Sequence, residues 1–400
     1  MKRKIKVLYF QHTGTYGGPC RSLGFTLPHL IENGVDPYVV CPKGKAQDYY
    51  RKFTNNVIDV NHRSVSLIQT VIGYPRTLIM VVKHYVKNIL YASHIEKIIL
   101  DVRPDLIHLN EFGMFRIGKI AKKYGIPTVA HARTMPNKHF PRLNRYIFRE
   151  FEKYCQHLFC ISGSVYDKMD VKHKSIVYNP VEKIPELKSF SDDKDVVQFL
   201  SLSAVRKSKG IIELMEAAKT LEGNASINIL VAGKIDLDVP KLSGKQKIMS
   251  ALGLIKIRET LAILEQIRAV QKRNKNIEFL GHVEDIDSLM RDKVDVMLAP
   301  MRLNSPPRSV FEAGVHGIPS ILSMEEKIED VIENNVNGFL IDENSSSQLV
   351  EAMLKLVNDK DLRIAMGKKA RERFIKNHDA KSIATKFYTV YKTVLKINIK

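Results

Sequence analysis

Short hydrophobic runs alternate with amphipathic stretches along most of the chain, which is the pattern of β-strands followed by α-helices. The first run, Lys4–Phe10, leads through a glycine-containing loop into a helical pattern over Ser22–Asn33. Strand, loop and helix together form the start of a βαβ unit, and later runs repeat it. The pattern therefore predicts an α/β protein whose parallel strands are covered by helices.

The alternation stops once and then restarts. Residues 179–195 contain two prolines and a charged run without apolar periodicity, so we interpret them as a linker. Before the linker we expect strands at 38–41, 105–109, 127–131, 158–162 and 175–178, and helices at 113–124 and 138–154. After it we expect strands at 196–202, 227–232, 277–280, 294–299, 319–322 and 338–341, and helices at 211–221, 257–271, 309–316, 328–334 and 347–357. These elements predict two sheets with a cleft between them, with ligands at the carboxyl ends of the strands.

Residues 236–276 exceed a usual connection, and we interpret them as an elaboration of unknown role.

Composition narrows the class of protein. The 400 residues have a net charge of +20 and 44% hydrophobic residues, which is ordinary for a globular protein. We find no run that reaches the roughly 20 apolar residues of a membrane span, and no signal-peptide pattern. Four cysteines without CxxC spacing predict neither a disulfide framework nor a metal site. We therefore expect a cytoplasmic protein.

The excess positive charge lies mainly in the first half of the chain. Residues 1–190 have 30 Lys and Arg against 14 Asp and Glu, whereas residues 191–400 have 33 against 29. A basic domain favours a polyanionic partner, although a lysine-rich surface without a partner is the alternative. Arg142, Arg145, Arg149 and Lys153 form one stripe on the helix predicted at 138–154. This stripe and the partly basic, apolar stretch 66–100 are candidates for an anionic membrane surface or a lipid-diphosphate acceptor; a solvated helix face is the alternative.

Three groups of residues follow strands or begin helices, where phosphate groups bind. Gly17 and Gly18 allow a ligand to approach the backbone, but they also fit a plain turn. The cations between Arg206 and Lys209 suit a diphosphate, or they form a simple surface cluster. The stretch 306–314 begins a helix in which a glutamate one turn in could accept hydrogen bonds from a ribose.

These motifs occur in a recognisable order. The second half resembles the donor domain of the family 4 glycosyltransferases, a retaining group with the GT-B fold of two Rossmann-like domains. The resemblance covers about 150 residues in six blocks: 203–210, 230–233, 277–283, 295–300, 311–319 and 337–341. The first half resembles the acceptor domain more loosely. The resemblance implies an acceptor domain at 1–185, a donor domain at 186–380 and a last helix, 381–400, that returns to the first domain.

The resemblance also implies roles for individual residues. Arg206 and Lys209 would neutralise the donor diphosphate, and Glu312 would bind the ribose. Ser309 and Val310 would offer backbone amides to the phosphates, the Gly17–Gly18 loop would lie beside the phosphates and the transferred sugar, and His131 would lie near that sugar. Apart from the resemblance, Arg308 lies in the first turn of the predicted helix, where amides can hold an anion, and we expect the cleft around Gly281 and Val283 to set the choice of base. Asn304 stands where the family has a second glutamate, Pro306 and Pro307 replace Phe-Gly, and the spacing from Arg206 to Lys209 is two residues shorter than usual, so Lys207 is an alternative lysine.

The combined prediction is a retaining glycosyltransferase that moves a sugar from a nucleoside diphosphate sugar to a saccharide or lipid-linked acceptor, peripheral on the inner face of the plasma membrane. Cations would replace a metal ion, because no Asp-x-Asp pair is evident near the expected cleft, and no cofactor is expected. A nucleotide-sugar epimerase and a non-catalytic partner subunit with the same fold are the alternatives; Asn304 and Pro306–Pro307 favour the second. A nucleic-acid partner has only the charge in its support, since no RNA-binding motif is present.

Overall fold

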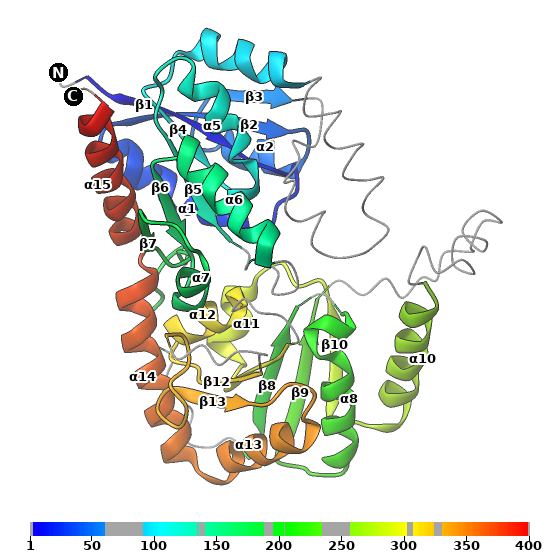
Figure 1. The fold of residues 1–400 in the computed structure, drawn as a ribbon. Helices are drawn as coiled ribbons and strands as arrows, with labels where there is room; N and C mark the ends of the chain where they lie inside the picture. Colours follow the sequence, from blue (N-terminus) through cyan, green and yellow to red (C-terminus); the bar gives the residue numbers. More distant parts are fainter. Residues whose placement is uncertain are drawn as a thin grey trace. The chain divides into compact units, whose positions relative to one another are not determined.

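The computed structural model describes residues 3–60, 91–133, 136, 141–187, 195–203, 205–233, 257–301, 307–323 and 330–398. The chain divides into two compact units. Unit 1 comprises residues 1–183 and 378–400, and unit 2 comprises residues 184–377. Each unit is built on one sheet in which every described pairing is parallel (Figure 1). The predicted α/β architecture with two parallel sheets is confirmed.

Unit 1 contains a seven-stranded sheet in the order β3-β2-β1-β4-β5-β6-β7. The strands are β1 (Ile5–Phe10), β2 (Val35–Pro42), β3 (Val57–Val60), β4 (Leu106–Leu109), β5 (Thr128–Ala132), β6 (His157–Cys160) and β7 (Lys174–Ile176). The helices are α1 (Gly18–Glu32), α2 (Lys45–Tyr50), η1 (Phe112–Met114), α5 (Arg116–Lys122), α6 (Pro141–Tyr154), α7 (Gly163–Lys168) and α15 (Ala380–Asn398), together with a helix at 91–102.

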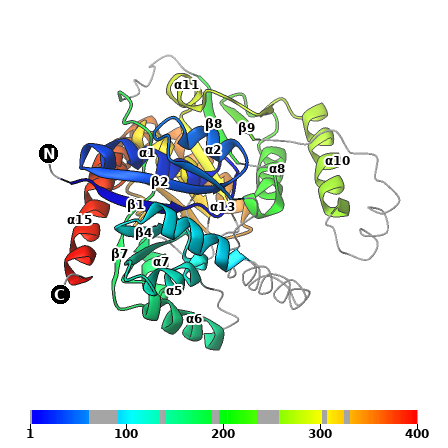
Figure 2. The ribbon, with the colours of Figure 1, turned by 90° about the horizontal axis from the view of Figure 1, so that it is seen from above.

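Alternate side chains of these strands enter two separate cores because successive residues of a strand point to opposite faces. Leu8 and Ile107 pack with the helix at 91–102, α5 and α6, whereas Val7 and Val39 pack with α1 and α15. Figure 2 shows α1 and α15 on one side of the sheet and α5 and α6 on the other. Both faces are therefore covered, as a fully parallel sheet requires.

Unit 2 contains a six-stranded sheet in the order β10-β9-β8-β11-β12-β13. The strands are β8 (Val197–Leu202), β9 (Ile227–Ala232), β10 (Ile277–Gly281), β11 (Val296–Pro300), β12 (Ser320–Ser323) and β13 (Gly338–Ile341). The helices are η2 (Lys207–Lys209), α8 (Ile211–Thr220), α10 (Ile257–Arg273), α11 (Ile286–Asp292), α12 (Arg308–Val315), α13 (Ser346–Asn358) and α14 (Lys360–His378). Side chains of α8, α10 and α13 share one core with the sheet, and those of α11 and α12 share a second one.

One predicted element is wrong in its described part. Residues 330–334 form a turn and an isolated bridge from Asn334 to Gly338 instead of a helix, and residues 324–329 lie outside the described residues. The Asn337 side chain accepts a hydrogen bond from the Glu333 amide at 2.7 Å and donates to the Val331 carbonyl at 3.1 Å, so a side chain satisfies backbone groups that a helix would pair. The sequence patterns also missed β3, α2, α11 and α14. Most of the stretch 66–100 and residues 234–256 of the elaboration lie outside the described residues.

The last helix is part of the core of unit 1. Phe387 of α15 lies 4.8 Å from Phe159 between ring centroids, and the Tyr391 hydroxyl is 2.6 Å from Nδ1 of His108. Phe387 is 3% exposed and Tyr391 is fully buried. The expected return of the last helix to the first domain is therefore observed. Among the described residues, no helix combines the length and apolarity needed to cross a membrane.

We predict that Phe387→Ala lowers the free energy of unfolding by about 3–5 kcal/mol, because it removes a buried ring from the contact of α15 with the sheet. The exposed Thr389 on the same helix provides the control, since Thr389→Ala should change stability by no more than about 0.5 kcal/mol. Guanidinium denaturation followed by circular dichroism measures both. Equal stability of the two variants would show that α15 is dispensable to the core.

Candidate functional site

In unit 2, the predicted cations lie in a tight turn at the carboxyl end of β8. Arg206 is extended, η2 follows, and Gly210 adopts a left-handed conformation with φ of 76° before α8 begins. A Cβ atom on Gly210 would lie 1.6 Å from the Pro300 carbonyl oxygen. Only glycine allows this approach. The turn is therefore held directly against the end of β11, on the edge of the sheet where ligands bind.

The cations of this turn differ in exposure. Arg206 and Lys207 are exposed, and Lys209 is half-buried. Burial lowers the pKa of Lys209, and the neighbouring Arg206 charge lowers it further. Both effects destabilise the free ammonium group, so a bound anion would relieve them. The exposure of Lys207 is also consistent with the alternative role that its sequence position suggested.

Helix α12 begins at the same edge of the sheet, after β11. Pro307 is its N-cap and forms no side-chain capping bond. Ser309 and Val310 are buried, and the Val310 amide donates to the Pro307 carbonyl at 3.1 Å in this structure. Asn304 and Pro306 lie outside the described residues. The structure thus places the predicted helix start at the expected edge, with the Val310 amide bonded within the helix.

Sequence reasoning missed an ion pair inside α12. Arg308 Nε lies 3.5 Å from Glu312 Oε1, and both side chains are mostly buried. The i,i+4 spacing of opposite charges was the signal that would have predicted it. The pair orients Glu312 and offsets its charge.

Gly281 ends β10 at the same edge, and Val283 follows it. Gly281 has φ of 67°, and its carbonyl accepts a hydrogen bond of 2.7 Å from the Gly233 amide after β9. No atom lies within 4 Å of a Cβ built on Gly281. The positive φ therefore explains why residue 281 is a glycine, and the space beside it is open within unit 2.

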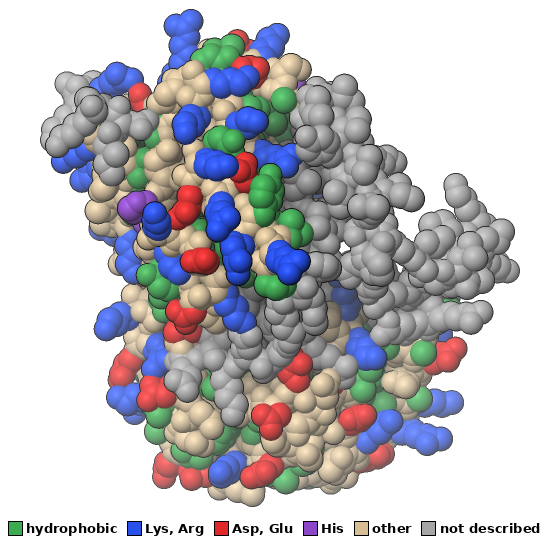
Figure 3. Space-filling model, in the orientation of Figure 1, with side chains coloured by type: hydrophobic (Ala, Val, Ile, Leu, Met, Phe, Trp, Pro, Cys, Tyr) green, Lys and Arg blue, Asp and Glu red, His purple; other side chains and the backbone are tan. Residues whose placement is uncertain are grey.

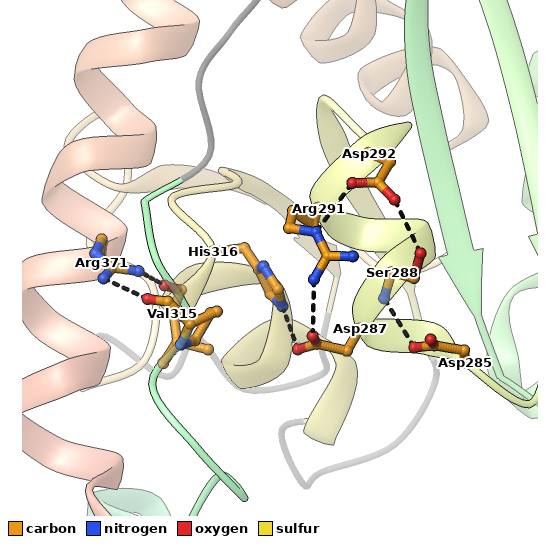
Figure 4. A network of polar contacts seen from close by, with 9 residues as sticks. Asp285, Asp287, Ser288, Arg291, Asp292, Val315, His316 and Arg371 are labelled. Carbon is orange, nitrogen blue, oxygen red and sulfur yellow. Dashed lines mark hydrogen bonds and ion pairs between the residues drawn. The ribbon is translucent and has the colours of Figure 1, made fainter.

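A polar network fixes the far end of α12 (Figure 4). His316, just after the helix, lies with Nε2 3.1 Å from Asp287 of α11, and Arg291 contacts the same carboxylate at 3.6 Å. Arg371 of α14 donates to the Val315 carbonyl. Burial lowers the pKa of His316, and Asp287 opposes that change. These contacts hold α12, and with it Glu312, against two neighbouring helices.

In unit 1, Gly17 and Gly18 lie at the start of α1, directly after the loop that follows β1. Gly17 is the N-cap, with no side-chain capping bond and an extended backbone that any residue adopts. A Cβ atom on Gly17 would meet only Thr15 Oγ1, at 3.9 Å. The fold of unit 1 thus does not require glycine at this position. The open space is what the close approach of a ligand to the helix N-terminus needs.

His131 ends β5 with its side chain inside unit 1 and is 1% exposed. Its ring lies 6.0 Å from that of Phe159 and 5.6 Å from that of Phe387, and its Nδ1 is 3.2 Å from Arg133 Nη2. Burial, then Arg133, then His108 hold the pKa of His131 well below its usual value, against the effect of the Val177 backbone. The imidazole is therefore neutral, and it packs beneath α15 instead of lining an open surface.

The sequence patterns also did not predict a buried polar network at the carboxyl edge of the sheet of unit 1. It consists of Gln11, Asn110, Arg133 and Asn179, which follow β1, β4, β5 and β7. The signal was a polar residue directly behind each apolar run. Since such residues collect at one edge of a parallel sheet, they could have been grouped from the sequence.

The predicted basic stripe is present on α6. Arg142, Arg145 and Arg149 are exposed, and Lys153, also exposed, pairs with Glu150 at 2.6 Å. The opposite side of α6 buries Ile147 and other apolar residues in the core. Figure 3 shows basic side chains gathered over the surface where α5 and α6 lie. The stripe is therefore a solvent-facing surface of a core helix.

Unit 2 also has an open pocket of about 620 Å³, lined by polar and apolar residues of β8, β9, β10 and α11 and of the segments beside them, among them Gln198 and Asn228. These two residues lie in the amino-terminal halves of their strands, away from the turn that carries Arg206. The pocket is therefore separate from the predicted site. Within the described part of the chain, no group of three or more His, Cys, Asp or Glu residues is arranged to hold a metal ion.

Comparison with known families covers nearly the whole chain. Residues 16–183 match the family model described as Glycosyltransferase Family 4, and residues 183–373 match the model described as Glycosyl transferases group 1. The chain belongs to glycosyltransferase family 4. This glycosyltransferase shares its fold with Anabaena HepE in complex with UDP, with a TM-score of 0.71 and 16% identity over 97% of this chain and 100% of that one.

A mutant of Staphylococcus aureus TarM in complex with fondaparinux, α-GlcNAc-glycerol and UDP aligns with a TM-score of 0.69 and 14% identity, over 97% of this chain and 99% of that one. The predicted GT-B fold is thereby confirmed. A curated relative, the poly(ribitol-phosphate) α-N-acetylglucosaminyltransferase of S. aureus (strain COL), is 21% identical over 330 residues, which are 79% of this chain. The glycosyltransferase spans about three-fifths of that relative's length, 61%.

We predict that Gly17→Ala leaves the fold intact and weakens UDP binding about tenfold or more, because the new methyl group enters the open space beside the α1 amides. Gly14 provides the contrast: a Cβ atom there would lie 2.1 Å from the Lys43 carbonyl oxygen, so Gly14→Ala should destabilise unit 1. Thermal melts and calorimetric titration with UDP separate the two effects. Unaltered UDP affinity in Gly17→Ala would remove this loop from the site.

Proposed function

We propose that this glycosyltransferase moves a sugar, with retention of anomeric configuration, from a nucleoside diphosphate sugar to a saccharide or lipid-linked acceptor. The turn that holds Arg206 and Lys209 against the end of β11 carries this proposal, because it concentrates positive charge at the edge of the sheet where a diphosphate would bind. The UDP in the complexes of HepE and TarM favours a uridine nucleotide.

The charges at this edge suit the chemistry. Cleavage of the bond between the sugar and the diphosphate leaves negative charge on the phosphate and positive charge on the sugar ring. Arg206 and Lys209 would stabilise the leaving diphosphate, and preorganised electrostatic stabilisation of this kind is commonly the largest catalytic effect. Glu312, oriented by Arg308, would accept hydrogen bonds from the ribose hydroxyls.

Without a protein nucleophile, retention requires the acceptor hydroxyl to attack from the side on which the diphosphate leaves. The bond from the sugar to the phosphate oxygen breaks, the bond to the acceptor oxygen forms, and the acceptor proton passes to the departing phosphate. No protein nucleophile enters this scheme. His131, neutral and buried beneath α15, would act by supporting the edge of sheet 1 near the sugar.

We further propose that unit 1 works at an anionic membrane surface on the cytoplasmic face, where lipid-linked acceptors are found. The basic stripe of α6 is exposed, and each cation near such a surface contributes about 1 kcal/mol to binding. The exposed ring of Tyr146, between the cations on the same helix, suits the interface.

We expect Arg206→Ala to lower turnover by at least about a hundredfold, since it removes the positive charge that would stabilise the leaving diphosphate. The matched control is Arg273→Ala, an exposed cation at the end of α10 in the same unit. Release of UDP from UDP-glucose and UDP-N-acetylglucosamine, with and without added acceptors, measures turnover. Near-normal rates in Arg206→Ala would exclude the assigned role. Tight UDP binding by the wild-type protein without any turnover would instead favour a non-catalytic partner subunit.

For the membrane, we expect wild-type protein to pellet with vesicles of phosphatidylglycerol and phosphatidylcholine but not with phosphatidylcholine alone. Replacing Arg142, Arg145 and Arg149 by glutamate should abolish the difference, because it reverses the charge of the stripe. The control carries the same charge change at three exposed cations of unit 2, Lys272, Arg273 and Lys275. Equal pelleting of wild type with both vesicles would contradict the proposal.

A further inference from the structure

Helix α1 starts in an unusual way for a helix of 15 residues. Its N-cap is Gly17, which cannot cap it with a side chain, and Pro19 lies in its first turn. Helix N-termini are ordinarily fixed by Ser, Thr, Asp or Asn, whose side chains occupy the first amides. Here the side-chain cap is absent. Because Pro19 has no amide hydrogen and the Arg21 amide donates to the Gly17 carbonyl at 3.0 Å, a ligand would meet the amides of Gly18 and Cys20. The position of the first turn must then be fixed from another direction.

Two hydrogen-bonded bridges fix the start of α1 from the carboxyl edge of the sheet, and both begin at Arg133. Arg133 Nη2 donates to Asn110 Oδ1 at 2.6 Å, and Asn110 Nδ2 donates to the Pro19 carbonyl at 3.0 Å. Arg133 Nη1 donates to Asn179 Oδ1 at 2.8 Å, and Ser22 Oγ donates to the same oxygen at 3.1 Å. Pro19 lies in the first turn of α1, and Ser22 begins the second.

The bridges are rigid because their members are buried. Asn110 is fully buried, Ser22 is 2% exposed, and Asn179 and Arg133 are each 8% exposed. Arg133 also donates from Nε to the Asn110 carbonyl at 3.0 Å, so it makes two hydrogen bonds to Asn110. The planar fork of a guanidinium group can hold several fixed acceptors at once, which a lysine cannot do.

The charge of Arg133 reaches the same turn. Burial raises the pKa of the Cys20 thiol in the first turn of α1 to about 11, and Arg133 opposes that rise. Burial and then Arg133 lower the pKa of His12 to about 4. A cation beneath a helix N-terminus adds to the positive end of the helix dipole. That arrangement is unfavourable when the site is empty and favourable when an anion binds.

We propose that Arg133 is a positioning residue for sugar transfer: it fixes the first turn of α1 through Asn110 and Asn179 and leaves the helix amides free for the donor phosphates. This inference rests on the proposed function, because it assigns the ligand of those amides. Arg133 itself does not touch the donor in this scheme. It acts through the two asparagines and through its charge.

The test compares Arg133→Met, Arg133→Lys and a matched control, Arg363→Met. Arg363 is also 8% exposed, but it lies on α14 in unit 2 and donates to the Leu356 carbonyl. Hydrogen exchange by mass spectrometry reports on residues 18–22, and calorimetry reports the affinity for UDP. We expect Arg133→Met to raise exchange in this segment at least tenfold and the dissociation constant for UDP about tenfold, and Arg363→Met to change neither.

Arg133→Lys separates geometry from charge. It should regain part of the UDP affinity, because the charge is kept, without restoring protection of α1. Unchanged exchange at residues 18–22 in Arg133→Met, or raised exchange with unchanged UDP affinity, would overturn the proposal. If Arg133→Met fails to fold, Asn179→Ala removes the bridge to Ser22 while keeping Arg133, and the same two results decide. If the wild-type protein binds no UDP, the proposed function fails and this inference fails with it.

Discussion

Parallel pairing of the strands is the constraint on which the rest of the molecule depends. Because every described pairing in both sheets is parallel, all strands of a sheet end at one edge, and the residues after them are brought together from distant parts of the chain. In unit 2 this collects the cation turn, the start of α12 and Gly281. In unit 1 it collects the glycines of α1 and the buried network around Arg133. Helices on both faces leave these edges as the places where polar groups can gather.

The sequence was sufficient for most strands of both sheets, because buried parallel strands are continuous apolar runs bounded by turn residues. The sequence predicted an element less well where the pattern of apolar residues is weak. The strand β3 is four residues long, and α14 has charged residues on all sides, so neither has a clear periodicity. The wrong helix at 328–334 followed from apolar spacing, whereas in the structure the Asn337 side chain bonds the Glu333 amide and the Val331 carbonyl in a turn.

Some features of the candidate site were likewise predictable from the sequence, and others were not. The positions of Arg206, Lys209 and Glu312 at the edge of a sheet were predictable, because they follow or precede elements with clear patterns. The ion pair of Arg308 with Glu312, the burial of His131 under α15 and the network of Arg133 were not predicted. The last two depend partly on contacts between residues more than a hundred positions apart, such as His131 with Phe387 and Asn179 with Ser22. Periodicity reports on neighbours along one element and is silent on such contacts.

The division of the chain has a consequence for its synthesis. Unit 2 is continuous, from Ile184 to Asn377, whereas unit 1 is assembled from residues on both sides of it. The core that contains Val7 and Leu27 also contains Phe387 and Tyr391, which are translated after the whole of unit 2. Domains commonly fold in the order in which they leave the ribosome. Here the second unit can complete its core first, while one face of the first sheet stays exposed until α15 emerges. During that interval the nascent chain is open to aggregation and to chaperones.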